Sequence, residues 1–178
     1  MTVLRLPAPR RLLAAVALAL AAGASQAGGL DLHGDADAAD VGLPAYPGAI
    51  KKTDKGGDPS GFKFGLWGES FGIKIAVVSY RSVDSVDKVA AFYRDALAKY
   101  GPVLDCSHVT KKLEPAPRPD DEKKGAKDKQ VTCDNDTVAP GGRLFKVGTG
   151  RAQRVFKASP WHDGVSFELV HVEEHGTD

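Results

Sequence analysis

Between residues 82 and 102 the apolar positions recur with the period of an α-helix. The side chains that share one face of this helix are Val86, Val89, Tyr93, Ala96, Leu97 and Tyr100. Asp84 is a suitable N-cap, and Gly101 followed by Pro102 favours termination. The pattern therefore predicts a single amphipathic helix whose aromatic side chains pack against a sheet.

Most of the remaining apolar residues alternate with polar ones, which is the period of a β-strand. Two such runs, at 62–67 and 73–80, flank glycines 68 and 72 and predict a hairpin. Further strands are expected at 103–109, 130–133, 143–147, 153–159 and 165–173. The sequence thus predicts an α+β fold, with a single antiparallel β-sheet of about five or six strands and one main amphipathic helix packed on a face.

The apolar residues of these strands indicate which sheet face is buried. We expect Phe64, Ile75, Val77, Phe167 and Leu169 to form that face. The helix would cover it with Val89, Tyr93 and Leu97.

Composition divides the chain into three regions. Residues 1–27 combine three arginines, an apolar run at 12–22 and Ser25-Gln26-Ala27, which predicts a cleaved secretory signal peptide. Residues 28–43 are rich in Asp, Ala and Gly and lack a period, so we expect a flexible acidic arm. Residues 44–178 are expected to form a single α+β domain with a charged loop at 111–129.

Export follows from the first of these regions. The apolar run is shorter than the roughly 20 residues of a membrane-spanning helix. We therefore expect a periplasmic or extracellular protein with no membrane span after cleavage of the signal peptide. With 24 Lys and Arg against 23 Asp and Glu, the chain also lacks the basic surplus of nucleic-acid-binding proteins.

The two cysteines, Cys106 and Cys133, flank the charged loop. An even number of cysteines in an exported protein predicts a disulfide. A redox pair and half of a metal site are the alternatives.

One cluster has a spacing that resembles a metal site. His171, Glu173 and His175 occupy alternate positions of the last strand, so they share a face, and imidazole and carboxylate are ligands for zinc. Alternate side chains on a strand are about 7 Å apart, which is wide for shared coordination. We therefore predict no metal and no other cofactor, and keep these three residues as the candidate ligands.

Residues 68–72 match the G-x-S-x-G pattern of serine hydrolases. That motif requires a helix directly after the serine, whereas a strand pattern follows here. Ser70 with Asp163 and His162 or His171 has the residue types of a catalytic triad, but no spacing brings them together. We therefore do not expect an enzyme.

Three short motifs suggest a relationship: YPGA at 46–49, VAAFYR at 89–94 and VGT at 147–149. With them, residues 44–172 resemble a group of small exported bacterial proteins of unknown function. The resemblance implies export and an α+β domain and adds nothing on activity.

The function that we expect is that of a non-enzymatic envelope protein with a structural or protein-interaction role. Its contact surfaces would be the loop at 111–129 and the sheet edge, and its partner another envelope protein. The alternative is a small-ligand-binding protein that uses the space between helix and sheet. The residues expected to line that space are Trp67, Tyr93, Tyr100 and Trp161. A metal-binding protein or a hydrolase is the third possibility.

Overall fold

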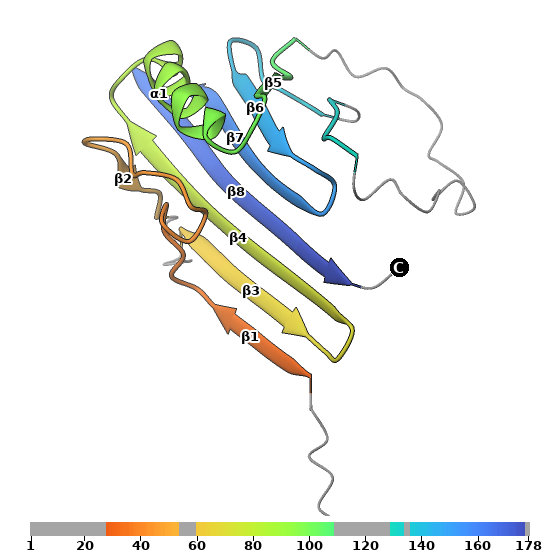
Figure 1. Cartoon of the computed structure of the whole chain (residues 1–178). Helices are drawn as coiled ribbons and strands as arrows, with labels where there is room; N and C mark the ends of the chain where they lie inside the picture. Colours follow the sequence, from red (N-terminus) through yellow and green to blue (C-terminus); the bar gives the residue numbers. More distant parts are fainter. Residues whose placement is uncertain (1–27, 54–59, 109–128, 134–135, 177–178) are drawn as a thin grey trace, which may run out of the picture.

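One antiparallel sheet of eight strands dominates the computed structural model, which describes residues 28–53, 60–108, 129–133 and 136–176 (Figure 1). The predicted signal peptide and all of the predicted charged loop except Lys129 lie outside the described residues. The strands are β1 (Gly29–His33), β2 (Ile50–Lys51), β3 (Gly61–Trp67), β4 (Phe71–Ser82), β5 (Leu104–Asp105), β6 (Arg143–Gly148), β7 (Ala152–Trp161) and β8 (Gly164–Gly176). Their order in the sheet is β1-β3-β4-β8-β7-β6-β5, and β2 pairs with β4.

The α+β class and the antiparallel sheet are confirmed, but the expectation of five or six strands is wrong. The pattern missed β1 and β2. Strand β1 points Leu30 and Leu32 into solvent and is held by backbone pairing with β3, so its apolar residues gave no sign of a buried face. Strand β2 has only two residues, too few for any period. The strand expected at 130–133 is reduced to one isolated bridge, between Gln130 and Thr149.

Residues 28–43 form strand β1 and a buried turn at 36–43, in place of the flexible arm that the sequence predicts. The turn, hereafter the 36–43 turn, is held by residues far away in the sequence. The backbone N–H of Ala38 donates to the Tyr80 hydroxyl at 3.0 Å, and Arg154 Nε donates to the carbonyl of Val41 at 2.9 Å. Such distant anchors leave no periodic signal in the segment itself.

Helix α1 (Val86–Ala98), the one helix among the residues that the structure describes, begins one residue later than expected. Ser85 is the N-cap, and its hydroxyl accepts a hydrogen bond from the backbone N–H of Lys88 at 3.3 Å. Asp84 was expected to be the cap, but its carboxylate accepts from the hydroxyl of Tyr46 at 2.7 Å and pairs with the Lys88 ammonium. In the described part of the chain, no helix has the length and apolarity needed to cross a membrane.

Helix α1 lies on one face of the sheet, which we call the helix face; the opposite one is the outer face (Figure 1). The buried aromatic side chains between helix and sheet are Tyr46, Tyr93, Phe145, Phe156 and Phe167. Their rings contact one another; those of Tyr93 and Phe156, for example, stack with centroids 5.0 Å apart. This aromatic cluster is the core of the domain.

Five of the eight expected core residues are correct, including Val89, Tyr93 and Leu97 of the helix. Phe167 and Leu169 are buried beneath the helix, and in strand β4 they pair with Tyr80 and Val78. Ile75 and Val77 have the opposite parity, so they lie on the outer face, as does Phe64, which pairs with Ile75. Strand β4 is apolar on both faces, and its sequence therefore does not reveal which face meets the helix.

The sulfur atoms of Cys106 and Cys133 lie at bonding distance, as the sequence predicts. Their Cα atoms are 5.3 Å apart and Cys106 is fully buried. The disulfide joins the end of β5 to the chain returning toward β6.

Candidate groove on the helix face

The helix face is divided along its strands into a covered half and an open half. Helix α1 lies over β6, β7 and one end of β8, and the 36–43 turn packs beside it against Tyr80 of β4 (Figure 1). The other end of β4 and β8, together with β1 and β3, carries a groove of about 780 Å³. We describe this groove as the candidate functional site.

The strand register explains why this part of the face is hollow. Side chains on the helix face form rows that cross the strands. The first row is Trp67, Gly72 and His175, and the second is Asp31, Gly65, Lys74 and Glu173. A glycine in each row lowers the floor, while the larger side chains on either side of it form the walls. Asp40 and Lys63 close the groove at the 36–43 turn.

Trp67 forms one wall, and two glycines determine how its ring lies. A Cβ atom built on Gly29 would overlap the indole ring, and one built on Gly65 would come within 3.2 Å of indole Cζ3. The indole ring therefore lies directly against the backbone of these two residues, in space that a side chain at either position would occupy. Trp67 remains 49% exposed and lines the groove.

Charged groups of both signs line the groove, mostly in pairs. His33 Nε2 lies 2.6 Å from Asp31 Oδ1, and His175 Nε2 lies 3.1 Å from Glu173 Oε1. Among the described residues, no carboxylate lies within ion-pair distance of the Lys74 ammonium. Lys74 therefore faces the groove without an ion pair in the described chain, with Glu173 as its cross-strand neighbour.

The ion pair between Lys63 and Asp40 fixes the end wall, with Nζ and Oδ1 3.2 Å apart. Burial alone would raise the pKa of Asp40. The hydrogen bond from the backbone of Asp37 and the ammonium of Lys63 outweigh it, so the pKa of this carboxyl is held below its usual value. The same pair raises the pKa of Lys63, chiefly through its hydrogen bond to Asp40. Both groups are therefore charged at neutral pH.

Glu173 lies between the other two candidate metal ligands, with one carboxylate oxygen near His171 and the other near His175. Glu173 and His175 line the groove, whereas His171 is only 7% exposed, with its Nε2 3.9 Å from Glu173 Oε2. Burial lowers the pKa of His171, and the positive charge of Arg154 lowers it further, while Glu173 acts in the opposite direction. His171 is therefore neutral at neutral pH.

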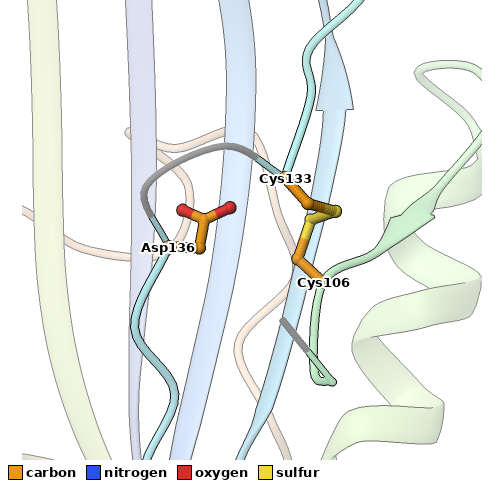
Figure 2. A group of neighbouring side chains, drawn as sticks. All are labelled: Cys106, Cys133 and Asp136. Atoms are coloured by element: carbon orange, nitrogen blue, oxygen red, sulfur yellow. A yellow bond between two sulfur atoms is a disulfide. The ribbon is translucent and has the colours of Figure 1, made fainter. Parts of the chain in front are cut away.

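Within the described ranges, one group of three residues brings potential metal-ligand atoms within 4.8 Å of one another. This group does not include any of the three ligands that the sequence suggested. It consists of Cys106, Cys133 and Asp136 (Figure 2). The two sulfur atoms are bonded to each other, so neither is a thiolate that could hold a metal. The Asp136 carboxylate instead pairs with Lys146, with Oδ1 and Nζ 2.8 Å apart.

The four aromatic candidates for a ligand site have different surroundings. Tyr93 is fully buried in the core, where its hydroxyl donates to the carbonyl of Pro44 at 3.2 Å. Tyr100 donates to the carbonyl of Gly42 and packs against the Arg154 guanidinium. Aromatic side chains thus fill the space that we expected a ligand to occupy. Trp67 lines the groove, and Trp161 lines a smaller hollow beside Arg81.

The residues of the candidate triad lie far apart. Ser70 is in the turn between β3 and β4, and His162 and Asp163 are in the turn between β7 and β8. These turns lie at opposite ends of β4, because Phe71 pairs with Gly176 whereas Ser82 pairs with Val165. A strand of this length separates them by roughly 35 Å.

The sequence did not predict that five titratable residues would line the groove: Asp31, His33, Asp40, Lys63 and Lys74. The only available signal was the alternation of Lys63, Gly65 and Trp67 along one strand, which places a cation, a gap and an aromatic ring on one face. Only the sheet register shows that this face meets Glu173 and His175 of strand β8.

In comparisons with known proteins, no family model matches the sequence, and neither a curated protein nor a solved structure matches it. The resemblance to small exported bacterial proteins therefore stays a prediction. The groove is the feature of the molecule from which a function can be inferred.

Proposed function

We propose that the protein is an exported, non-enzymatic binding protein that holds a small polar ligand in the groove. The observation that carries this proposal is the combination of a glycine floor, an exposed indole and charged walls in one hollow of the sheet. The predicted signal peptide supports export, and a disulfide is typical of oxidising compartments. The site differs from the helix–sheet space that the sequence suggested, because aromatic side chains fill that space.

Gly72 is the strongest reason to treat the groove as a binding site. Glycine inside a strand weakens it and often marks the close approach of a ligand or of another backbone. A Cβ atom built on Gly72 would have no neighbour closer than 3.7 Å, and the residue does not have a positive φ. No contact within the described residues therefore requires glycine at this position, and the open space above it remains for a ligand.

The test is to fill that space. Gly72→Leu adds a side chain between Trp67 and His175 without a backbone clash. Gly176→Leu is the matched control, because Gly176 lies on the same strand pair but on the outer face, where its Cβ also has room. Both changes are made in a Trp161→Phe background, so that Trp67 is the only tryptophan and reports on the groove.

Fluorescence titrations would use a library of amino acids, organic acids, nucleosides, polyamines and saccharides. We expect at least one compound to give a saturable change that Gly72→Leu abolishes and Gly176→Leu preserves. The proposal is wrong if no compound gives a saturable change. It is also wrong if every compound that binds the starting protein binds the Gly72→Leu variant equally well.

A protein-interaction role is the second candidate function, and the outer face favours it. Leu30 and Leu32 are each 69% exposed on β1, and they lie beside Leu66 and Phe64 of β3. Among the described strands, β1 is also an edge of the sheet, with a neighbouring strand on one side only. A second copy of the chain could pair along this edge and bring the leucines of both copies together.

Sedimentation velocity over a range of protein concentrations tests this second role. Self-association should weaken in a Leu30→Ser, Leu32→Ser variant and persist in Val83→Ser, which replaces an exposed apolar residue between β4 and α1. A monomer at every concentration would exclude self-association as the role of this face.

A further inference from the structure

The groove lining also indicates a class of ligand, an inference that rests on the proposed binding function. The lining alternates in charge: Asp31, Asp40 and Glu173 are acidic, and Lys63 and Lys74 are basic. A ligand with a large charge of either sign would meet groups of its own sign in the groove. A neutral ligand with several hydroxyl groups would not, because each hydroxyl can donate to a carboxylate and accept from an ammonium.

Trp67 adds the second requirement. Its indole lies against the backbone at Gly29 and Gly65 and is half exposed toward the groove. An aromatic surface that is already fixed in place costs little conformational entropy when a ligand binds. It attracts a flat apolar surface edged with polar groups. The C–H face of a pyranose ring, surrounded by its hydroxyl groups, is such a surface.

The dimensions agree with a ligand of this kind. Trp67 and His175 flank Gly72 on three adjacent strands, so their backbones are about 10 Å apart. The row formed by Asp31, Lys74 and Glu173 runs parallel to them, about 7 Å along the strands. A volume of about 780 Å³ lies within the range of small-molecule sites and is sufficient for two or three sugar rings.

We infer that the groove binds a neutral saccharide. One pyranose ring stacks on the exposed face of the Trp67 indole, beside the open space at Gly72. Its hydroxyl groups donate to the carboxylates of Asp31 and Glu173 and accept from the ammonium of Lys74. Lys63 and Asp40 bound the end of the groove, where a second ring would lie.

Isothermal titration calorimetry tests this inference with four probes: the neutral trisaccharides of glucose, galactose, mannose and N-acetylglucosamine. At least one should bind the wild-type protein with a dissociation constant between about 0.1 and 10 mM, as expected for an open polar site. Trp67→Ala should weaken that binding at least about tenfold, the loss of roughly 1.4 kcal/mol. Trp161→Phe, which alters the tryptophan outside the groove, should leave it unchanged.

Three further variants distinguish a loss of stacking or hydrogen bonding from general damage to the fold. Trp67→Phe keeps an aromatic face and should retain more affinity than Trp67→Leu, which keeps only the apolar character. Asp31→Asn, on the exposed edge strand, should weaken binding severalfold while the circular dichroism spectrum stays unchanged. Equal affinity in Trp67→Phe and Trp67→Leu would contradict stacking as the mode of recognition.

The results also distinguish this inference from the proposed function. If no trisaccharide binds at about 10 mM, the saccharide inference is wrong. The groove nevertheless remains a binding site if another library compound binds and Gly72→Leu abolishes its binding. If neither a trisaccharide nor any library compound binds, both proposals are wrong.

Discussion

The covered and open halves of the helix face are built from the same two central strands, yet their side chains are of opposite character. In the covered half, Phe167 of β8 and Tyr80 of β4 lie beneath α1 and the 36–43 turn, and their rings stack with centroids 5.5 Å apart. In the open half, the same face of the same strands carries Lys74 and Glu173. The backbone pairing continues without interruption through both halves, so the change in character does not arise from the sheet itself.

This difference shows that the sheet is longer than its core requires. The change occurs at Ala76 and His171, a cross-strand pair next to the 36–43 turn. Beyond that pair the strands continue to Phe71 and Gly176 without burying large apolar side chains on this face. Cross-strand hydrogen bonds and the apolar residues of the outer face support this extension, which leaves its helix-face side chains free to bind a ligand.

The largest expected effect contrasts the two halves directly. Phe156→Ala removes a fully buried ring that stacks on Tyr93 and Phe145, so it should lower the free energy of unfolding by about 3–5 kcal/mol. Lys74→Ala, in the open half, should change it by less than about 0.5 kcal/mol. Urea unfolding monitored by circular dichroism measures both values. Similar losses in the two variants would show that the open half is part of the core.

Removing the disulfide should cause the next largest loss of unfolding free energy. The loss should arise in the covered half and leave the groove in the open half unchanged. The bond closes a loop with a sequence separation of 27 residues, so Cys106→Ala with Cys133→Ala should lower the free energy of unfolding by about 2–4 kcal/mol. The wild-type protein with and without a reducing agent is the matched control. Ligand affinity at the groove should be unchanged, and a large change would show that the two halves are coupled.

A smaller effect is expected at the boundary, where pH acts on His171. Because the pKa of His171 in the folded protein is below its ordinary value of 6.5, the unfolded chain binds more protons in this range. The stability that its neutral form contributes is therefore present above pH 6.5 and is lost as the pH falls through the lowered pKa. We expect His171→Asn to flatten the dependence of the unfolding free energy on pH in the range from about 7 to about 5.

His175→Asn is the control for this measurement, because His175 is largely exposed at the end of the same strand. The carboxyls with lowered pKa values, such as Asp84 beside Lys88 and Tyr46, lose their stabilising charge only at more acidic pH, below 3.8. A wild-type curve that is flat from pH 7 to 5 would rule out a buried neutral His171.

Elements with local signals could be predicted from the sequence, whereas those that depend on distant contacts could not. The apolar stripe of α1 and the glycines between β3 and β4 identify those elements directly. The 36–43 turn could not be predicted, because Tyr80, Tyr100 and Arg154 hold it from distant parts of the chain. The parity of β4 could not be assigned either, since both of its faces are apolar.

The groove illustrates the same limit. Trp67 was a candidate for an aromatic ligand site, and Glu173 and His175 were candidates for a metal site. Pairing of β3 with β4 and of β4 with β8 brings all three residues into one hollow, where they suggest a single, different function. Asp31 was not predicted to line a site, because its segment was expected to be a flexible arm.

The positions of the first and last described strands have a practical consequence for experiments. Gly29 pairs with Trp67 and Gly176 pairs with Phe71, so β1 begins and β8 ends at the groove side of the sheet (Figure 1). An affinity tag fused at either position would emerge at the mouth of the groove, and a histidine tag would add imidazoles beside His175. Immobilisation for surface-based assays is better made through the turn at Asp163, at the opposite end of β8.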